Sequence, residues 1–179
     1  MARARNRQAG FTLIEMMIVV AIIAILAVLV IPQFMEESSK TKARSEVTAF
    51  FAELQTRQEQ FRVDNSAYFP VPAGATTACP SAPVQAAQPV DCTAAGKPWD
   101  GLNVAPPTTT AFCSYTMTSG SGAGLTSVTI DGFAFTFLAP AGIWYHLSGK
   151  CDLDGDSTSV TFFTSSVDST VQRSTDAAE

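Results

Sequence analysis

Residues 10–32 read GFTLIEMMIVVAIIAILAVLVIP, and this stretch decides how the rest of the chain is interpreted. Within it, residues 16–31 are sixteen consecutive apolar residues without glycine or proline. As a helix this run is about 24 Å long, because an α-helix rises about 1.5 Å per residue. A bilayer core requires about 20 residues, and flanking apolar residues supply the remainder. The stretch therefore predicts a membrane-spanning helix over residues 11–35, with Glu15 as its only ionisable residue.

Three other interpretations of this stretch are weaker. A secretory signal peptide needs small residues in an A-x-A-like pattern after the apolar run, whereas residues 31–35 read IPQFM. A plain membrane anchor leaves Glu15 unexplained, because a carboxylate at the bilayer centre costs at least about 2.5 kcal/mol. A core helix that is apolar on every side needs a large protein around it, and the rest of this chain contains too little apolar sequence.

The letters GFTLIE at residues 10–15, followed by the apolar run, resemble the N-terminus of type IV pilins and of type II secretion pseudopilins. The first ten residues, MARARNRQAG, are similar to the leader of such precursors, since this segment is short and basic and ends in glycine. The resemblance implies that a prepilin peptidase and methyltransferase cuts between Gly10 and Phe11 and N-methylates Phe11. It covers residues 10–35 strongly, and it says little about residues 70–179.

Two further residues match the same pattern. Glu15 corresponds to the acidic residue at the fifth mature position, and Pro32 corresponds to a proline that kinks the helix. Cleavage would create an α-amine at Phe11, and in a filament the amine of one subunit can face Glu15 of a neighbour. Pairing removes much of the cost of a buried carboxylate. The charge would therefore specify axial register, while apolar side chains supply non-directional burial.

The remainder of the chain indicates a helix followed by a sheet, the α+β class. We expect a long kinked N-terminal helix packed on a C-terminal antiparallel β-sheet. The predicted parts are a cleaved leader, a transmembrane or filament-core helix, an amphipathic continuation of that helix, a variable Pro-rich loop region, an antiparallel sheet and a polar tail. Their ranges are 1–10, 11–35, 36–64, 65–110, 111–167 and 168–179.

Helical spacing predicts the face on which the globular part packs. This face consists of Ala43, Val47, Phe50, Phe51, Leu54 and Phe61. The helix should end near residues 64–66, and Trp99 is expected to be a packing anchor within the loop region. Residues 120–124 read as a flexible glycine-rich connection, Asp131-Gly132 as a hairpin turn, and the tail after Val167 as frayed. The expected strands are 111–118, 126–130, 133–138, 143–147 and 159–165.

Four cysteines follow the apolar run, and an even number behind a membrane-targeting segment indicates two disulfides formed in an oxidising compartment. Three pairings are open. We favour Cys79–Cys92, which closes a Pro-rich loop, together with Cys113–Cys151, which joins two predicted strands. A zinc site is less consistent with the sequence, because it contains no C-x-x-C spacing and only one histidine.

Residues 151–156, CDLDGD, are the one metal-like motif. Asp152, Asp154 and Asp156 alternate with other residues and could surround Ca²⁺ with hard oxygen ligands. The motif is not an EF-hand, because its glycine stands at loop position four and Phe163 occupies position twelve. The alternative is an acidic turn between strands. Some relatives in the resembled family use a C-terminal calcium loop, which keeps structural calcium open as the alternative; otherwise we expect no cofactor.

Charge and residue pattern exclude several functional classes. The net charge is −5, and because the leader carries three arginines and no acid, the mature chain carries −8. This balance opposes direct nucleic-acid binding by the bulk surface, and the basic residues Lys40, Lys42 and Arg44 are interpreted as a solvated helix face. His146 is expected in a half-buried strand, and no catalytic constellation is present. We expect a structural protein, not an enzyme.

The sequence therefore predicts a type IV pilus subunit that is held in the inner membrane as a prepilin and then polymerises with other pilin subunits into a surface filament. Inner-membrane assembly machinery is an implied partner, and adhesion, motility and DNA uptake are open roles. A type II secretion pseudopilin in a periplasmic pseudopilus is the alternative, and a single-pass membrane protein with a binding domain is the third.

Overall fold

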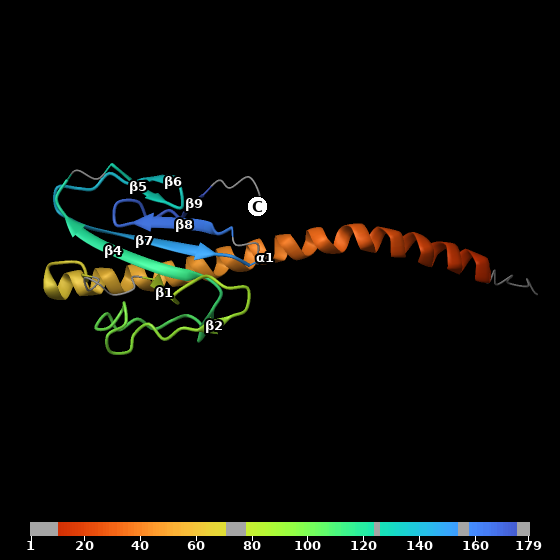
Figure 1. The fold of residues 1–179 in the computed structure, drawn as a ribbon, viewed down its shortest axis with the longest axis horizontal. Helices are drawn as coiled ribbons and strands as arrows, with labels where there is room; N and C mark the ends of the chain where they lie inside the picture. The colour runs from red at the N-terminus through yellow and green to blue at the C-terminus, as the bar shows by residue number, and fades with distance from the viewer. Residues whose placement is uncertain (1–10, 71–77, 124–125, 154–157, 175–179) are drawn as a thin grey trace, which may run out of the picture. The chain divides into compact units, whose positions relative to one another are not determined.

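The computed structural model describes residues 11–70, 78–123, 126–153 and 158–174, and for 29–37 and 39–40 it describes the backbone alone. The chain forms two compact units, residues 1–38 and residues 39–179. The predicted α+β class is confirmed: α1 (Leu13–Asn65) precedes strands that pair in antiparallel fashion (Figure 1). The second unit contains residues 39–65 of α1 and all of these strands.

α1 ends at Asn65 because the next residue leaves the helical conformation. Ser66 has a φ of 55°, and its amide donates to the carbonyl of Arg62 at 2.8 Å. This is the left-handed type of helix C-cap. The side chain of Asn65 donates to the carbonyl of Phe61 at 3.0 Å. Two terminal carbonyls are thus satisfied at the position where the sequence predicted the helix to stop.

Five strands form the main antiparallel sheet, in the order β1–β4–β7–β8–β9. The central strand β7 (Ile143–Cys151) pairs with β4 (Ser114–Ser121) on one side and with β8 (Val160–Ser165) on the other. The edge strands β1 (Ala78–Cys79) and β9 (Gln172–Arg173) contain two residues each. Such short edges limit unwanted pairing with other chains.

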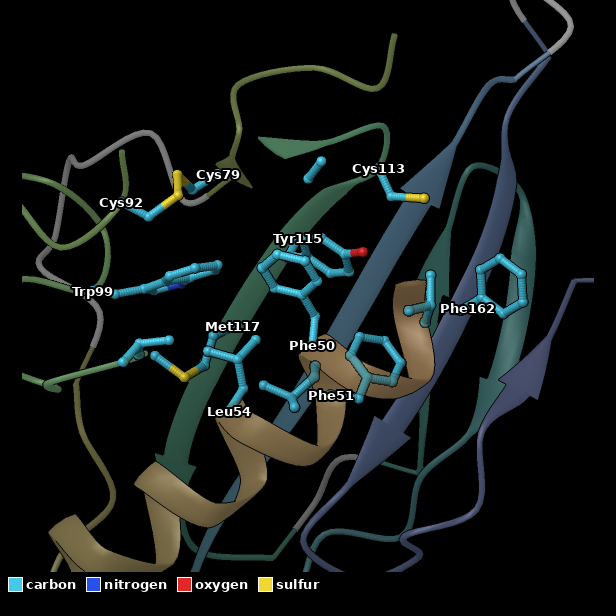
Figure 2. Packing of buried hydrophobic residues seen from close by; sticks show 14 of the residues in the cluster. Phe50, Phe51, Leu54, Cys79, Cys92, Trp99, Cys113, Tyr115, Met117 and Phe162 are labelled. Atoms are coloured by element: carbon cyan, nitrogen blue, oxygen red, sulfur yellow. A yellow bond between two sulfur atoms is a disulfide. The ribbon is translucent and has the colours of Figure 1, made fainter. Parts of the chain in front are cut away.

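The first core lies between the second half of α1 and the sheet. Figure 2 shows Phe50, Phe51 and Leu54 pointing from α1 toward the sheet. The Phe50 ring stacks on the Tyr115 ring with centroids 4.5 Å apart. The sequence-predicted helix face is therefore confirmed as core, with Val47, Phe50 and Leu54 fully buried. Burying each of these side chains contributes about 1.5–3 kcal/mol.

A second core lies on the other face of the sheet. Strand β5 (Ser127–Ile130) and strand β6 (Phe133–Thr136) form a separate two-stranded hairpin, which Figure 1 shows on the opposite side of the sheet from residues 39–65 of α1. The Phe135 ring stacks on Phe163 of β8 at 5.1 Å. At the turn, Asp131 and Gly132 have φ values of 50° and 83°, as a type I′ turn requires. The hairpin was predicted, but its separation from the main sheet was not.

The main sheet differs from the sequence prediction at three places. The strand predicted from residue 111 is divided: β3 (Thr110–Ala111) pairs with β2 (Gln88–Pro89), and β4 begins at Ser114. The segment 120–124, predicted as flexible, begins inside β4, because Gly120 and Ser121 pair with β7. The tail from 168, predicted to fray, contains β9.

The strand β7 also extends four residues beyond its prediction. Residues 148–151 look polar or small, yet residues 148–150 pair with both β4 and β8, and Cys151 pairs with β8. Gly149 leaves little room for a side chain, because a Cβ atom at this position would lie 3.3 Å from the Tyr115 ring and 3.5 Å from Phe51. In the sequence alone, such a glycine indicates the end of a strand, although here it lies within the strand and leaves space for an aromatic ring of the neighbouring strand.

Candidate assembly site at the N-terminal helix

The large apolar side chains between Phe11 and Val28 are exposed. Their exposed fractions range from 44% at Val19 to 78% at Leu13. They surround the helix on all sides, because every residue from 11 to 26 is exposed. A contiguous apolar surface of this kind is typical of a segment that contacts lipid or other protein chains. This surface, residues 11–28, is hereafter the apolar segment.

Thr12 caps the N-terminus of α1. Its hydroxyl accepts a hydrogen bond from the amide of Glu15 at 3.3 Å, and its carbonyl accepts one from the amide of Met16 at 3.3 Å. Thr12 and Glu15 thus have the residue types and the spacing of a capping box. Glu15 is exposed and stands in the first helical turn, where the helix dipole favours a negative charge. Glu15 was predicted from the sequence, whereas the cap was not.

Of the other residues predicted to act at the N-terminus, the structure describes only some. Phe11 is 75% exposed, directly before the cap, whereas Gly10 lies outside the described residues. α1 continues as a helix through Pro32, and the kink predicted at this residue stays a prediction. Within the part of the chain that the structure describes, no helix combines the length and the apolar character that crossing a membrane requires.

The structure joins Cys79 to Cys92 and Cys113 to Cys151, the two pairs that the sequence favoured. Their Cα–Cα distances are 5.8 and 4.3 Å. Trp99, predicted as an anchor, is fully buried, and its amide donates to the carbonyl of Cys92 at 3.0 Å. Figure 2 shows its ring beside the Cys79–Cys92 pair. The Pro-rich region is therefore held in place by the first disulfide and by the buried Trp99 side chain next to it.

The predicted calcium loop lies mostly outside the described residues. Asp152 is partly buried and follows Cys151 of the second disulfide, whereas Asp154 and Asp156 are not described. Among the described residues, no three acidic, histidine or cysteine side chains gather as a metal site would require. His146 was expected in a half-buried strand; it lies in β7 and is 9% exposed.

Sequence reasoning missed a carboxylate that attaches α1 to the sheet. The Glu46 carboxylate accepts hydrogen bonds from the amides of Phe112 and Cys113 at 2.9–3.1 Å. It also accepts one from the Tyr115 hydroxyl at 2.9 Å. Burial, followed by the Glu46 charge and its hydrogen bond, raises the pKa of Tyr115. The sequence signal was weak, because Glu46 occurs among many charged residues on the helix surface.

Gln58 performs a similar role near the end of α1. It is fully buried, and its side-chain carbonyl accepts a hydrogen bond from the Phe69 amide at 2.9 Å, while its amide donates to the Met117 sulfur. Glu53 accepts a hydrogen bond from the Ala105 amide at 2.8 Å. Polar side chains of α1 therefore hold three separate segments of the loop and sheet region.

A groove of about 580 Å³ lies between the C-terminal part of α1 and the ends of β7 and β8. Its lining includes Gln55, Glu59, Gln60, Tyr145, Ser165 and Ser166. Burial raises the pKa of Tyr145, so its hydroxyl stays protonated at neutral pH. The groove offers hydroxyl, amide and carboxylate groups, and its described lining contains no arrangement of a nucleophile with a base.

The N-terminal part of the chain matches a known family model. A family model described as the prokaryotic N-terminal methylation motif matches residues 5–31. The chain is 43% identical over 67 residues to the type II secretion system core protein G of Pseudomonas aeruginosa, which is 36% of this chain and 44% of the relative. It is 44% identical over 59 residues to the type IV wide pilus major component of Thermus thermophilus, 33% of this chain and 44% of the relative.

A third relative, the type IV major pilin protein of Myxococcus xanthus, is 43% identical over 67 residues, which cover 37% of this chain and 30% of the relative. The chain thus matches less than half the length of these relatives. No solved structure matches it significantly. The resemblance to pilins and pseudopilins is confirmed: this chain carries the prokaryotic N-terminal methylation motif, and over about a third of its length it is similar to members of both groups.

Proposed function

We propose that this chain is a structural subunit of a type IV pilus, and that it is not an enzyme. It is inserted in the inner membrane as a prepilin, cleaved after Gly10, N-methylated at Phe11 and polymerised into a surface filament. One observation carries the proposal above all others: the methylation motif over residues 5–31 coincides with an exposed apolar segment. An exposed apolar helix requires lipid before assembly and other subunits after it.

The apolar segment and Glu15 have different tasks in this assembly. Apolar burial is non-directional, so it holds subunits together without choosing their register. Glu15 is exposed, and a neighbouring Phe11 amine would offer it an opposite charge. Because a carboxylate left unpaired in an apolar surrounding is costly, only the register that pairs them is favourable. The residues after 38, which form their own compact unit, would supply the filament surface.

The implied partners are other pilin subunits, a prepilin peptidase and methyltransferase, and an inner-membrane assembly machinery. The relatives named as pilus components support polymerisation with like subunits. The net charge of −5 gives no support to direct nucleic-acid binding.

A type II secretion pseudopilin is the second candidate, because several relatives carry the name core protein G of that system. For this second candidate we also propose a structural calcium ion bound by Asp152, Asp154 and Asp156. Its support is the position of the motif directly after Cys151, which the second disulfide fixes to Cys113. A calcium-dependent rise in thermal stability that Asp154→Ala abolishes would support it, and identical melting with calcium or chelator would exclude it.

The deciding experiment is N-terminal peptide mass spectrometry on two fractions of cells that produce the chain: sheared surface material and the cell envelope. A mature N-terminus at methylated Phe11 in the sheared fraction supports the pilus. The same N-terminus confined to the envelope favours the pseudopilus. An uncut N-terminus in cells with an active prepilin peptidase overturns both and returns the third interpretation, a single-pass protein with a binding domain.

A further inference from the structure

The β5–β6 hairpin is attached to the main sheet through its turn, through aromatic side chains at its other end, and through a hydrogen bond from the Gln172 side chain of β9 to the Thr136 carbonyl at 3.4 Å. At its turn, the Asp131 carboxylate pairs with Lys150 Nζ at 2.6 Å and accepts a hydrogen bond from the Thr161 hydroxyl at 3.3 Å. At its other end, Phe135 of β6 and the following Phe137 belong to the second core. The ion pair is partly exposed, with 34% and 41% of the two side chains accessible, so it contributes little to stability. The aromatic contacts therefore carry most of the attachment.

His146 lies inside these aromatic contacts. Its ring stacks on Phe163 with centroids 5.5 Å apart, lies edge-on to Phe137 at 5.7 Å, and is parallel to Trp144 at 6.0 Å. Only 9% of the residue is exposed. Its Nδ1 atom is buried without a hydrogen-bond partner among the described residues. A buried polar atom without a partner is uncommon in native proteins and calls for an explanation.

No charged side chain is recorded against the His146 ring in the part of the chain that the structure describes. Its register partners are Thr118 on β4 and Ser165 on β8, and its ring neighbours are aromatic. The charged groups on the packed elements are Lys150 of β7, Asp131 of the hairpin turn, Asp168 after β8 and Arg173 of β9. Burial alone lowers the pKa of His146 to about 4, since a charge in this apolar site loses its hydration.

We propose that the β5–β6 hairpin is an acid-released cover on the aromatic face of the sheet, and that protonation of His146 is the trigger. Protonation places a positive charge on a ring whose buried Nδ1 atom has no hydrogen-bond partner among the described residues. Release of the hairpin transfers the imidazole to water. The release also uncovers Trp144 and Phe163, an aromatic surface suited to apolar contacts.

The direction of the pH dependence follows from linkage. The closed form holds a neutral His146, whereas in the released form the ring has its ordinary pKa of about 6.5. Above about pH 6.5 neither form binds the proton, so the opening equilibrium is constant. Between about pH 6.5 and 4 the released form binds one more proton, and opening rises about tenfold per pH unit. Below about pH 4 both forms are protonated and the effect saturates at roughly 300-fold.

Hydrogen–deuterium exchange on the full-length chain in detergent tests the proposal from about pH 7.5 to about pH 3.5, with rates corrected for intrinsic exchange. Amides of β5 and β6 should lose protection at about tenfold per pH unit below about pH 6.5, whereas the β4–β7 pairs should stay protected. His146 is the only histidine, so its NMR titration can be assigned without ambiguity. Hairpin protection that is unchanged across this range would overturn the proposal.

Two variants separate the trigger from the ion pair. His146→Phe keeps an aromatic ring and removes the proton site, so hairpin protection should lose its pH dependence between about pH 6.5 and 4. Asp131→Asn removes the ion pair, so opening should increase at all pH values while the slope remains. If the slope persists in His146→Phe and vanishes in Asp131→Asn, the trigger is the ion pair and the proposal fails. His146→Gln provides the same test if the Phe variant does not fold.

These measurements need no filament, and thus the proposal stands apart from the proposed pilus or pseudopilus function. Its biological setting does rest on that function, because a subunit outside the inner membrane meets the pH of its surroundings.

Discussion

At the scale of single residues, carboxylates on α1 have two distinct functions. Glu15 is exposed in the first turn, where its charge is available to another molecule. Glu46 is partly buried and directs its oxygens at donors of the same chain. The sequence shows both simply as acidic residues on a helix. Their different surroundings lead to different predictions.

Replacing Glu15 by Ala should leave cleavage and membrane insertion intact and abolish filament assembly, because the neighbouring Phe11 amine loses its partner. Immunoblots of membrane and sheared fractions measure both. The control is Thr12→Ala, which removes the helix cap at a cost of about 1 kcal/mol and leaves the Glu15 charge in place. Normal filaments from the Glu15 variant would refute the register argument, and equal loss in both variants would reassign Glu15 to capping.

Replacing Glu46 by Ala leaves the amides of Phe112 and Cys113 and the Tyr115 hydroxyl without an acceptor. Each unsatisfied buried group costs about 1–3 kcal/mol, so unfolding free energy should fall by roughly 3 kcal/mol or more. Denaturant titration followed by circular dichroism measures the change. Glu53→Ala, which releases one loop amide and a partly exposed arginine, should lose about 1 kcal/mol. Equal losses of unfolding free energy in the two variants would show that the hydrogen bonds of Glu46 stabilise the fold no more than those of Glu53.

At the scale of elements, the two cores on opposite faces of β7 depend on glycines within strands. Gly149 admits Tyr115 on the face toward α1, and Gly120 of β4 lies under Trp144 on the other face. A Cβ atom at Gly120 would lie 2.4 Å from the Trp144 ring. This proximity explains why a glycine that looked like part of a flexible connection belongs to a paired strand.

Gly120→Ala should therefore displace Trp144 and destabilise the second core by about 1–3 kcal/mol, the usual cost of overpacking. Thermal unfolding and near-ultraviolet circular dichroism measure the loss and the change in tryptophan environment. Gly142→Ala is the matched control, because no atom lies within 4 Å of a Cβ atom there. Similar melting of the Gly120 variant and the native chain would contradict this account of the packing.

At the scale of the whole molecule, the two disulfides constrain different lengths of chain. Cys113–Cys151 spans 38 residues and Cys79–Cys92 spans 13. Loop-closure entropy predicts a stabilisation of about 4 kcal/mol for the longer loop and about 3 kcal/mol for the shorter. The double variant Cys113→Ala/Cys151→Ala should thus unfold more easily than Cys79→Ala/Cys92→Ala. The reverse order in denaturant titrations would show that packing around Trp99 outweighs chain entropy.

Much of the candidate site could be predicted because it depends on local sequence. The apolar run, the acidic residue and the leader are contiguous, and so are the helix face around Phe50 and the Asp131-Gly132 turn. The role of Glu46 as an acceptor could not be predicted, because its partners are 66 and 67 residues away in the sequence. The surroundings of His146 could not be predicted either, because its partners lie on other strands.

The sequence by itself determined the helix, its apolar N-terminal segment, the α+β class and the resemblance to pilins and pseudopilins. The physical reason is that hydrophobic periodicity and a contiguous motif act over a few residues of chain. Only the tertiary structure decided that the hairpin forms its own layer, that β9 completes the sheet, and that His146 is enclosed by aromatic rings. These features arise from contacts between distant segments, whose burial no local pattern specifies.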